Sequence, residues 1–334
     1  MNIIDVNGLN FSGKSALVDL LREYECIEAP HYAEEFDLIR MPGGLGSLYD
    51  AFVAGEEIRI DSAIRRFKQT VKYLARNPKG FSRFFRSGLN YGQRYPSFET
   101  TLKKFIDQII IDKWYKKSPY ETPEVPKSQI FFDKLKGRLS GRLNWPYIDF
   151  HLGDRDAFFK LVERIVPAIL ESAKSSSQKT KIVIQNASGV VNPKHNISII
   201  PKAKWITVLR DPRDMYINSN VKTKMNFDKK TFSEIFGCHD VDLFINKQNK
   251  LRHSIFKDKS VLVISLEDLV YKFDETHLKI QGHIGVNNSD WVHRGKFFKV
   301  NETMKNTKLW EKHPEYQVDC DRILCYLTNY CYRY

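Results

Sequence analysis

The first 24 residues contain an apolar run, a glycine loop and an amphipathic segment in direct succession. Residues 3–6 are predicted to form a short buried strand, and the leucines within residues 15–24 recur at helical spacing. Between them, the sequence GLNFSGKS from Gly8 to Ser15 satisfies the pattern G-x-x-x-x-G-K-[ST]. A strand, a glycine loop and a helix in this order predict the opening of an α/β nucleotide-binding sheet.

The glycine loop is predicted to bind phosphate, because a chance glycine-rich turn would not be expected directly between a strand and an amphipathic helix. Its glycines let backbone N–H groups turn inward around phosphate oxygens, and the helix that begins at Lys14 directs its positive dipole end there. The pattern leaves the phosphate compound open. The candidate binding residues are Gly8, Asn10, Phe11, Ser12, Gly13, Lys14 and Ser15.

The rest of the chain continues the α/β pattern. Residues 181–185, 205–209 and 261–265 are short β-branched runs typical of parallel strands. Residues 101–117 have helical spacing, whereas residues 118–149 are rich in turn formers and predict an irregular region. We expect an α/β fold of the P-loop nucleotide-binding type, with a parallel central sheet flanked by helices. The simplest organisation is a single domain over residues 1–334 with a largely helical insert at residues 40–175.

The amino-acid composition indicates which classes of ligand and partner the protein can bind. The 334 residues carry a net charge of +13, which favours anionic ligands. No nucleic-acid-binding signature is present, so nucleic acid is not an expected partner. Five cysteines without a CxxC pair indicate reduced thiols, and no apolar run is long enough to span a bilayer. We therefore expect a soluble, cytoplasmic protein. Its oligomeric state does not follow from the sequence.

A second anion site is predicted in the sequence KWITVLRDPRDMYINSN. An apolar strand delivers Arg210 to its end, Pro212 suits a first helical turn, and Asn218 and Ser219 lie two turns further on. The forked guanidinium of an arginine suits a phosphate group. The alternative is a surface loop in which Arg210 pairs with Asp214.

The residues that follow the predicted strands indicate whether the protein can bind Mg²⁺. An enzyme that hydrolyses or transfers phosphate from Mg-ATP needs an acidic residue at the end of an apolar strand. The three later strands run instead into Asn186, Arg210 and the sequence LED, and Asp211 is the nearest acidic substitute. No metal is therefore expected. A Mg-ATP-dependent P-loop kinase of a small molecule stays the alternative function.

These motifs together resemble the sulfotransferases that use 3′-phosphoadenosine 5′-phosphosulfate. That family combines an N-terminal glycine loop for the 5′-phosphosulfate with a strand, an Arg-Asp-Pro-Arg-Asp motif and a helix for the 3′-phosphate, and residues 208–214 are similar to this second motif. Residues 261–270 are similar to its strand, Glu-Asp-Leu and helix segment, and residues 304–310 look like its donor-covering segment. The resemblance covers residues 1–40 and 180–334.

The resemblance implies in-line transfer of a sulfuryl group to a hydroxyl or amine of a glycan or small-molecule acceptor. The product of the donor would be 3′,5′-adenosine bisphosphate. The insert has no counterpart in this resemblance, and we expect it to bind the acceptor. Lys14 stands where the family usually has Thr, and Phe11 where many members have Lys or Arg. Lys14 is therefore expected to neutralise the leaving phosphate.

The resemblance also implies the residues that hold the 3′-phosphate. Arg210 would bind it together with Asn218 or Ser219, since either side chain can hydrogen-bond a phosphate. Arg294 and Gly295 are a loose counterpart of the family's Arg-Lys-Gly loop.

A general base is needed to remove the acceptor proton. Family members place a Glu or His soon after the first helix or further along the chain, and residues 28–36 offer Glu28, His31, Glu34 and Glu35. Ligands of open α/β sheets bind at the carboxyl ends of strands, which favours this stretch if residues 25–28 form the second strand. We expect Glu34 to be the base, with His31 as the second candidate and His151 as an outside one.

Overall fold

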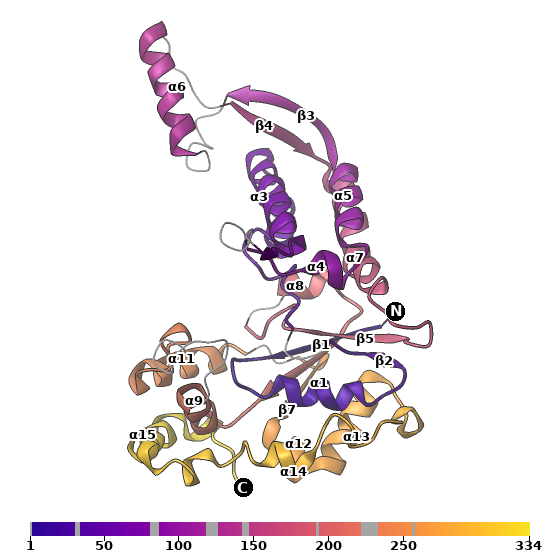
Figure 1. Cartoon of the computed structure of the whole chain (residues 1–334), viewed down its shortest axis with the longest axis vertical. Coiled ribbons are helices and arrows are strands. Elements are labelled where there is room, and N and C mark those ends of the chain that lie inside the picture. The colour runs from indigo at the N-terminus through magenta and orange to yellow at the C-terminus, as the bar shows by residue number, and fades with distance from the viewer. Residues whose placement is uncertain are drawn as a thin grey trace. The chain divides into compact units, whose positions relative to one another are not determined.

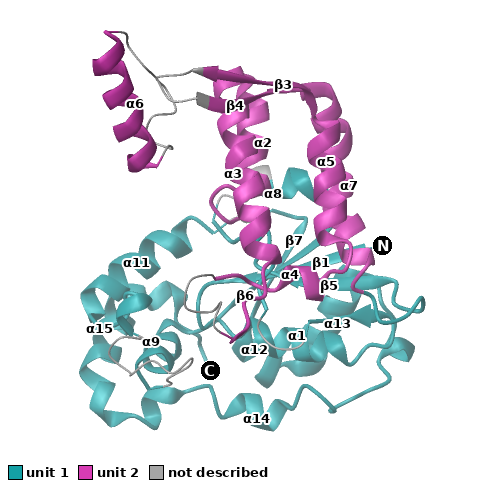
Figure 2. Cartoon of the chain, turned by 45° about the horizontal axis from the view of Figure 1, so that its top comes forward, with its two compact units in different colours: residues 1–37, 174–334 teal, residues 38–173 magenta. Residues whose placement is uncertain are grey.

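The computed structural model describes residues 2–30, 34–80, 87–117, 126–141, 147–191, 194–221, 233–255 and 258–334. The chain divides into two compact units, coloured separately in Figure 2. Unit 1 contains Met1–Asp37 and Lys174–Tyr334, and unit 2 contains Leu38–Ala173.

Unit 1 is built on a parallel sheet, labelled in Figure 1. Within the described residues the sheet has five strands in the order β2-β5-β1-β6-β7. The expected α/β fold with a parallel central sheet flanked by helices is therefore confirmed. The strands are β1 (Asn2–Gly8), β2 (Ile27–Glu28), β5 (Lys181–Gln185), β6 (Lys204–Leu209) and β7 (Val261–Ser265).

The helices of unit 1 follow the strands in the chain. Its α-helices are α1 (Lys14–Arg22), α8 (Lys194–Ile199), α9 (Pro212–Val221), α11 (Val241–His253), α12 (Leu266–Tyr271), α13 (Phe273–Ile284), α14 (Val300–Met304) and α15 (Gln317–Leu327). Its short 3-10 turns are η3 (Asn288–Asp290), η4 (Leu309–Glu311), η5 (Pro314–Tyr316) and η6 (Thr328–Tyr330).

The strand order predicts a ligand-binding crevice beside β1 and β6. The chain leaves β1 toward β2 at one edge of the sheet, and it leaves β6 toward β7 at the opposite edge. Neighbouring parallel strands whose connections diverge in this way border the crevice where open α/β sheets bind ligands. The register pairs Gly8 of β1 with Val208 of β6, so the segments that follow these two strands begin side by side.

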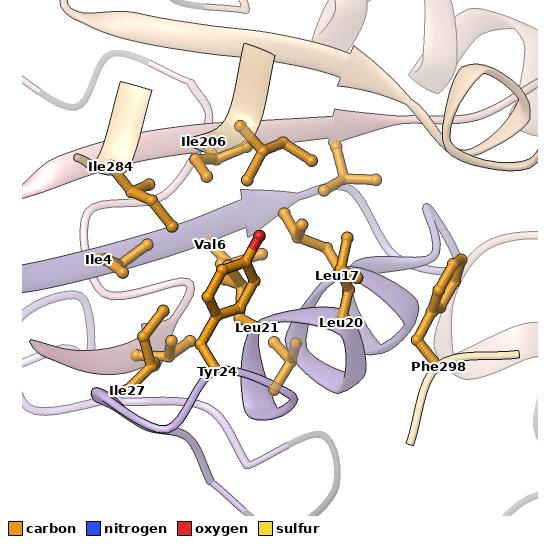
Figure 3. Packing of buried hydrophobic residues seen from close by; sticks show 14 of the residues in the cluster. Ile4, Val6, Leu17, Leu20, Leu21, Tyr24, Ile27, Ile206, Ile284 and Phe298 are labelled. Carbon is orange, nitrogen blue, oxygen red and sulfur yellow. The ribbon is translucent and has the colours of Figure 1, made fainter. Parts of the chain in front are cut away.

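Helix α1 covers one face of this sheet. Its Leu17, Leu20 and Leu21 are completely buried, and Figure 3 shows them packed with Ile4 and Val6 of β1. Because side chains alternate along a strand, Asp5, which lies between Ile4 and Val6, faces the other side of the sheet. The helical spacing of the leucines thus places all three on the side of α1 that packs against the sheet.

The end of α1 is fixed by a buried carboxylate. Glu23 directly follows the helix and is completely buried. Its Oε1 accepts hydrogen bonds from the backbone N–H groups of Phe297, at 2.9 Å, and Phe298, at 2.8 Å. Its Oε2 accepts one from Trp291 Nε1, at 2.8 Å. One side chain thus joins α1 to a segment more than 260 residues away.

Unit 2 is mostly helical, with an antiparallel pair of strands. The Phe52 and Phe158 rings stack in its core, 4.1 Å apart and almost parallel. Its helices are α2 (Leu45–Ala54), α3 (Glu57–Ala75), α4 (Tyr91–Arg94), α5 (Phe98–Gln108), α6 (Lys127–Ser140) and α7 (Arg155–Glu171), and its strands are β3 (Ile110–Lys117) and β4 (Tyr147–Gly153).

Two expectations for this unit are wrong. Residues 101–117 do not form one helix, because α5 ends at Gln108 and the following residues pair with β4 as strand β3. Residues 118–149 are not irregular throughout, because they contain α6 and the start of β4. The isoleucines and aromatic residues of β3 favour a strand only when a partner is present, and the partner lies about 30 residues further along the chain.

Two further expectations concern cysteines and membranes. All five cysteines are free thiols. Among the helices of the described ranges, none combines the length and apolar composition that crossing a membrane requires.

The Glu23 contacts predict a specific loss of stability. Glu23→Ala leaves three donors without their acceptor, which is expected to cost about 3 kcal/mol and lower Tm by roughly 6–12 °C. Thermal unfolding followed by circular dichroism measures this. The matched control is Glu25→Ala, since Glu25 is exposed. Equal Tm values for the two variants would contradict the role of Glu23.

Candidate functional site

The glycine loop has a backbone that only glycine permits at both ends. A Cβ atom at Gly8 would lie 2.2 Å from Ser12 Oγ and 2.7 Å from the Val208 carbonyl oxygen. Gly13 has a φ of +90°, and a Cβ there would lie 2.8 Å from Leu266 Cδ2. The two glycines of the sequence pattern therefore bring the loop into contact with β6 and α12.

The loop presents hydrogen-bond donors at the start of α1. The backbone N–H groups of Gly13 and Ser15 donate to none of the described residues, as expected for the first turn of a helix. Lys14 Nζ donates to the carbonyl oxygens of Gly8, at 3.1 Å, and Leu9, at 3.2 Å, so its charge lies over the loop. The side chains of Asn10 and Ser15 are exposed, Phe11 is half-buried, and Ser12 Oγ is buried without a partner among the described residues.

Arg210 directly contacts this loop. Its Nη1 donates to the Phe11 carbonyl oxygen at 2.9 Å, and its Nη2 donates to the carbonyl oxygen of Asn306. Arg210 is 4% exposed and makes no ion pair with Asp214, which is completely buried. The alternative of a surface loop in which these two residues pair is therefore wrong. The structure brings the two sequence motifs together.

Two buried carboxylates, Asp214 and Glu267, lie close enough to Arg210 to interact with its charge. Asp214 accepts hydrogen bonds from the backbone N–H groups of Lys308, at 3.1 Å, and Leu309, at 2.6 Å. Glu267 Oε1 accepts one from the Asp211 N–H at 2.8 Å. Burial raises the pKa of Asp214 to about 6, although Arg210 opposes the shift, and burial raises the pKa of Glu267 to about 7.

Asp211 is already bound by other protein groups. Its carboxylate accepts three hydrogen bonds from Arg213, one from the backbone N–H and two from the guanidinium. It accepts another from the Tyr332 N–H at 2.9 Å, and it is 1% exposed. Asp211 therefore holds the C-terminal segment against the start of α9.

Asn218 and Ser219 differ in their availability. Ser219 is completely buried, and its hydroxyl donates to the Tyr216 carbonyl oxygen of its own helix at 2.7 Å. Asn218 is 7% exposed, and its amide has no hydrogen bond to the described part of the chain. It lies one turn beyond Asp214 on the same side of α9. Asn218 is the one whose side chain is available for a ligand.

Residues 34–36 run along the end of β5, and Asn186 links them to the glycine loop. Asn186 Oδ1 accepts a hydrogen bond from the Gly8 N–H at 3.2 Å, and its Nδ2 donates to Glu35 Oε1 at 2.5 Å. The backbone of Phe36 is also bound to Gln185 at 2.8 Å. Glu35 is thus the carboxylate that the structure connects to the loop.

The other base candidates are placed differently. Glu34 is half-buried, and its backbone carbonyl accepts a hydrogen bond from Gln185. Glu28 Oε2 accepts hydrogen bonds from the N–H and hydroxyl of Ser175, so it fixes a turn. His31 lies outside the described residues. The sequence offered Glu35 among four candidates, but it gave no sign of the Asn186 contact that distinguishes it.

Arg294 and Gly295 do not lie at the glycine loop. Arg294 donates to the carbonyl oxygens of Trp291 and Asn288, in the segment that Glu23 fixes at the far end of α1. Helix α1 rises about 14 Å between Lys14 and its C-cap at 1.5 Å per residue. The structure therefore separates this pair from the other predicted phosphate ligands.

His151 belongs to a buried polar network within unit 2. Its N–H and its Nδ1 both bond Asp61 Oδ1, at 2.8 and 2.9 Å, and Arg65 donates to Oδ2 at 2.6 Å. A carboxylate only accepts, so Nδ1 carries the proton and Nε2 accepts from Lys68 at 2.8 Å. In this arrangement the lone pair that a base would use is taken.

The comparison with solved structures gives a distant likeness. No family model matches the chain, and no curated protein does. A solved structure similar to it is the sulfotransferase STF9 from Mycobacterium avium, with 10% identity and a TM-score of 0.32. The comparison covers 96% of this chain and 76% of that one.

The raised pKa of Glu267 predicts how stability depends on pH. The folded protein keeps this carboxyl protonated up to about pH 7, whereas the unfolded chain releases the proton near its ordinary pKa of 4.5. Stability is therefore lost as pH rises from 4.5 to 7. Glu267→Gln removes this loss, so the variant is expected to exceed the wild type by up to about 3 kcal/mol at pH 8.

Thermal unfolding at pH 5 and pH 8 measures the effect. The Tm difference between wild type and Glu267→Gln should be larger at pH 8 than at pH 5. Glu25→Gln, at an exposed position, should follow the wild type at both pH values. A Tm difference independent of pH would show that Glu267 is ionised in the folded protein throughout.

Proposed function

We propose that this protein is a sulfotransferase that moves a sulfuryl group from 3′-phosphoadenosine 5′-phosphosulfate to a hydroxyl or amine. The observation that carries the proposal is the 2.9 Å contact between Arg210 Nη1 and the carbonyl oxygen of Phe11. This contact brings Arg210, at the end of β6, next to the glycine loop after β1, which carries the cation of Lys14. A donor with a phosphate at each end of its ribose is the chemistry that such a pair of cations suits.

The residues of the crevice fit this donor. The N–H groups of Gly13 and Ser15, which have no acceptor among the described residues, and the ammonium of Lys14 would hold the 5′-phosphosulfate. Arg210 Nε is a buried donor without a partner among the described residues, and the Asn218 amide is likewise unused. These two side chains would hold the 3′-phosphate. The bound donor would supply the activated sulfuryl group.

Lys14 and the loop would act on the leaving group. Transfer forms a bond from the acceptor oxygen or nitrogen to sulfur and breaks the bond from sulfur to the phosphate oxygen. Negative charge then grows on that phosphate oxygen. Lys14 and the N–H groups at the start of α1 are fixed before reaction, so they stabilise this charge without reorganising.

Glu35 is the best-supported general base. Its carboxylate is connected through Asn186 to the N–H of Gly8, so it lies at the carboxyl ends of β5 and β1. A carboxylate there can take the acceptor proton as the new bond forms. Glu34 and His31 stay predictions. The insert, residues 40–175, stays the predicted acceptor-binding region, and a glycan and a small molecule are both open as acceptors.

A small-molecule kinase that uses Mg-ATP is the second candidate. The complete Gly-Lys-Ser loop and the exposed Ser15 favour it, since that hydroxyl binds Mg²⁺ in P-loop enzymes. Asp211, the acidic residue nearest to the end of β6, is instead bound by Arg213 and Tyr332. The sulfotransferase proposal does not need an acidic residue there.

Ligand binding separates the two candidates. Isothermal titration and thermal shift should give binding and stabilisation with 3′,5′-adenosine bisphosphate in the absence of metal. Arg210→Ala is expected to weaken this binding roughly 10- to 100-fold, because a charge-assisted hydrogen bond is lost. Asn218→Ala tests the same site without removing the contacts of Arg210 to Phe11 and Asn306.

The control is Arg164→Ala, an exposed arginine on α7, which should bind the bisphosphate as the wild type does. Stabilisation by Mg-ATP alone would overturn the sulfotransferase proposal in favour of the kinase. Unchanged bisphosphate affinity in both Arg210→Ala and Asn218→Ala would refute the assigned 3′-phosphate site.

The assignment of the base is tested by Glu35→Gln. The variant keeps an oxygen to accept from Asn186 but cannot take a proton. Release of 3′,5′-adenosine bisphosphate with a mixture of hydroxyl and amine acceptors should fall about 10²- to 10⁴-fold. Bisphosphate affinity should stay unchanged. If Glu34→Gln lowers turnover more than Glu35→Gln does, the original expectation for Glu34 holds instead.

A further inference from the structure

Most residues of helix α6 are exposed. None of its side chains is buried. Five of its fourteen residues are nevertheless large and apolar. Ile130 is half-buried, and the other four are 63%, 59%, 43% and 81% exposed. In order, they are Phe131, Phe132, Leu135 and Leu139. Exposed apolar residues concentrated in one short helix mark an interaction surface rather than ordinary surface composition.

The four side chains form one stripe. Phe131, Leu135 and Leu139 are spaced by four residues, and Phe132 is three and seven residues before the two leucines. At 3.6 residues per turn, these positions share one side of the helix over more than two turns. The stripe is therefore continuous and wide enough to be embedded in an apolar phase.

Basic residues border the stripe on both sides. On a helical projection, Lys127, Lys134 and Arg138 lie along one border and Lys136 lies along the other. The one acidic residue of the helix, Asp133, lies on the opposite side from the stripe. An apolar stripe bordered by long cationic side chains is the pattern of helices that lie in a membrane interface, because these side chains reach the lipid phosphates.

We propose that α6 (Figure 2) binds the surface of an anionic lipid membrane, with its apolar stripe in the headgroup region and its four cations on lipid phosphates. Charge complementarity decides this occupant. A second copy of the helix would bring the cations at the borders of both stripes together, which opposes self-pairing. The net charge of +13 of the whole chain adds long-range attraction to an anionic surface.

Strand β3 of the same unit offers side chains of the same character. Trp114 is 44% exposed and Tyr115 is 75% exposed. These two residue types are enriched where membranes meet water, because one end of each ring system is apolar and the other is polar. Helix α6 would lie on the membrane and would not cross it.

The test is co-sedimentation of the full chain with vesicles. We expect binding to vesicles of phosphatidylcholine with 30% phosphatidylserine and at least 10-fold weaker binding to pure phosphatidylcholine. The double variant Phe131→Gln/Phe132→Gln and the triple variant Lys134→Gln/Lys136→Gln/Arg138→Gln should each weaken anionic-vesicle binding at least 10-fold. Because α6 has no buried side chain, both variants should keep the wild-type Tm.

Matched controls lie on other helices and loops. Leu278→Gln/Tyr326→Gln removes two apolar side chains that are 66% and 67% exposed. Lys202→Gln/Lys250→Gln/Lys259→Gln removes three exposed cations. Both controls should bind anionic vesicles within about two-fold of the wild type.

Three outcomes would overturn the proposal. The first is absence of binding to anionic vesicles. The second is loss of binding in the lysine and arginine variant but not in the phenylalanine variant, which would show general electrostatic adsorption. The third is a dimer in sedimentation equilibrium that the phenylalanine variant abolishes, without vesicle binding, which would make a second copy the occupant.

Discussion

The candidate site depends on a buried arginine that donates to the backbone of the glycine loop. Arg210 is 4% exposed, and burial lowers the pKa of its guanidinium, while Asp214 and Glu267 oppose the shift. The cost of burying the charge is offset because its two terminal nitrogens donate to the carbonyl oxygens of Phe11 and Asn306. The end of β6, the loop after β1 and the segment after α14 are thereby held together.

Backbone strain near this arginine has a visible support. Lys308 has a φ of +51°, a conformation that costs free energy for any residue with a side chain. The carboxylate of Asp214 accepts hydrogen bonds from the N–H groups of Lys308 and Leu309, which holds the backbone in this turn. Since the same segment supplies the carbonyl of Asn306 to Arg210, the strained turn and the buried arginine support one another.

The unusual side chains of the two units differ in their exposure to solvent. In unit 1 the unusual groups are a buried arginine and buried carboxylates with raised pKa values, beside a loop whose N–H groups at Gly13 and Ser15 have no acceptor in the described part of the chain. In unit 2 the unusual groups are exposed, since α6 presents aromatic and aliphatic side chains to solvent. Buried charge suits a site that binds and orients a small anion, whereas an exposed apolar stripe suits an extended surface.

The sequence by itself determined the elements whose signals are local. The strand, loop and helix at the N-terminus, the strands at residues 181–185, 205–209 and 261–265, and the phosphate pattern at Gly8 to Ser15 follow from side-chain periodicity and glycine spacing. Only the tertiary structure decided which distant residues meet. The contact of Arg210 with Phe11, the link from Glu35 through Asn186 to Gly8, and the pairing of β3 with β4 each join segments separated along the chain, and no local periodicity encodes them. The same reason explains why the position of Arg294 could not be predicted. Its sequence resembled a phosphate-binding loop of the family, but the contacts of Glu23 hold its segment at the end of α1 away from the glycine loop.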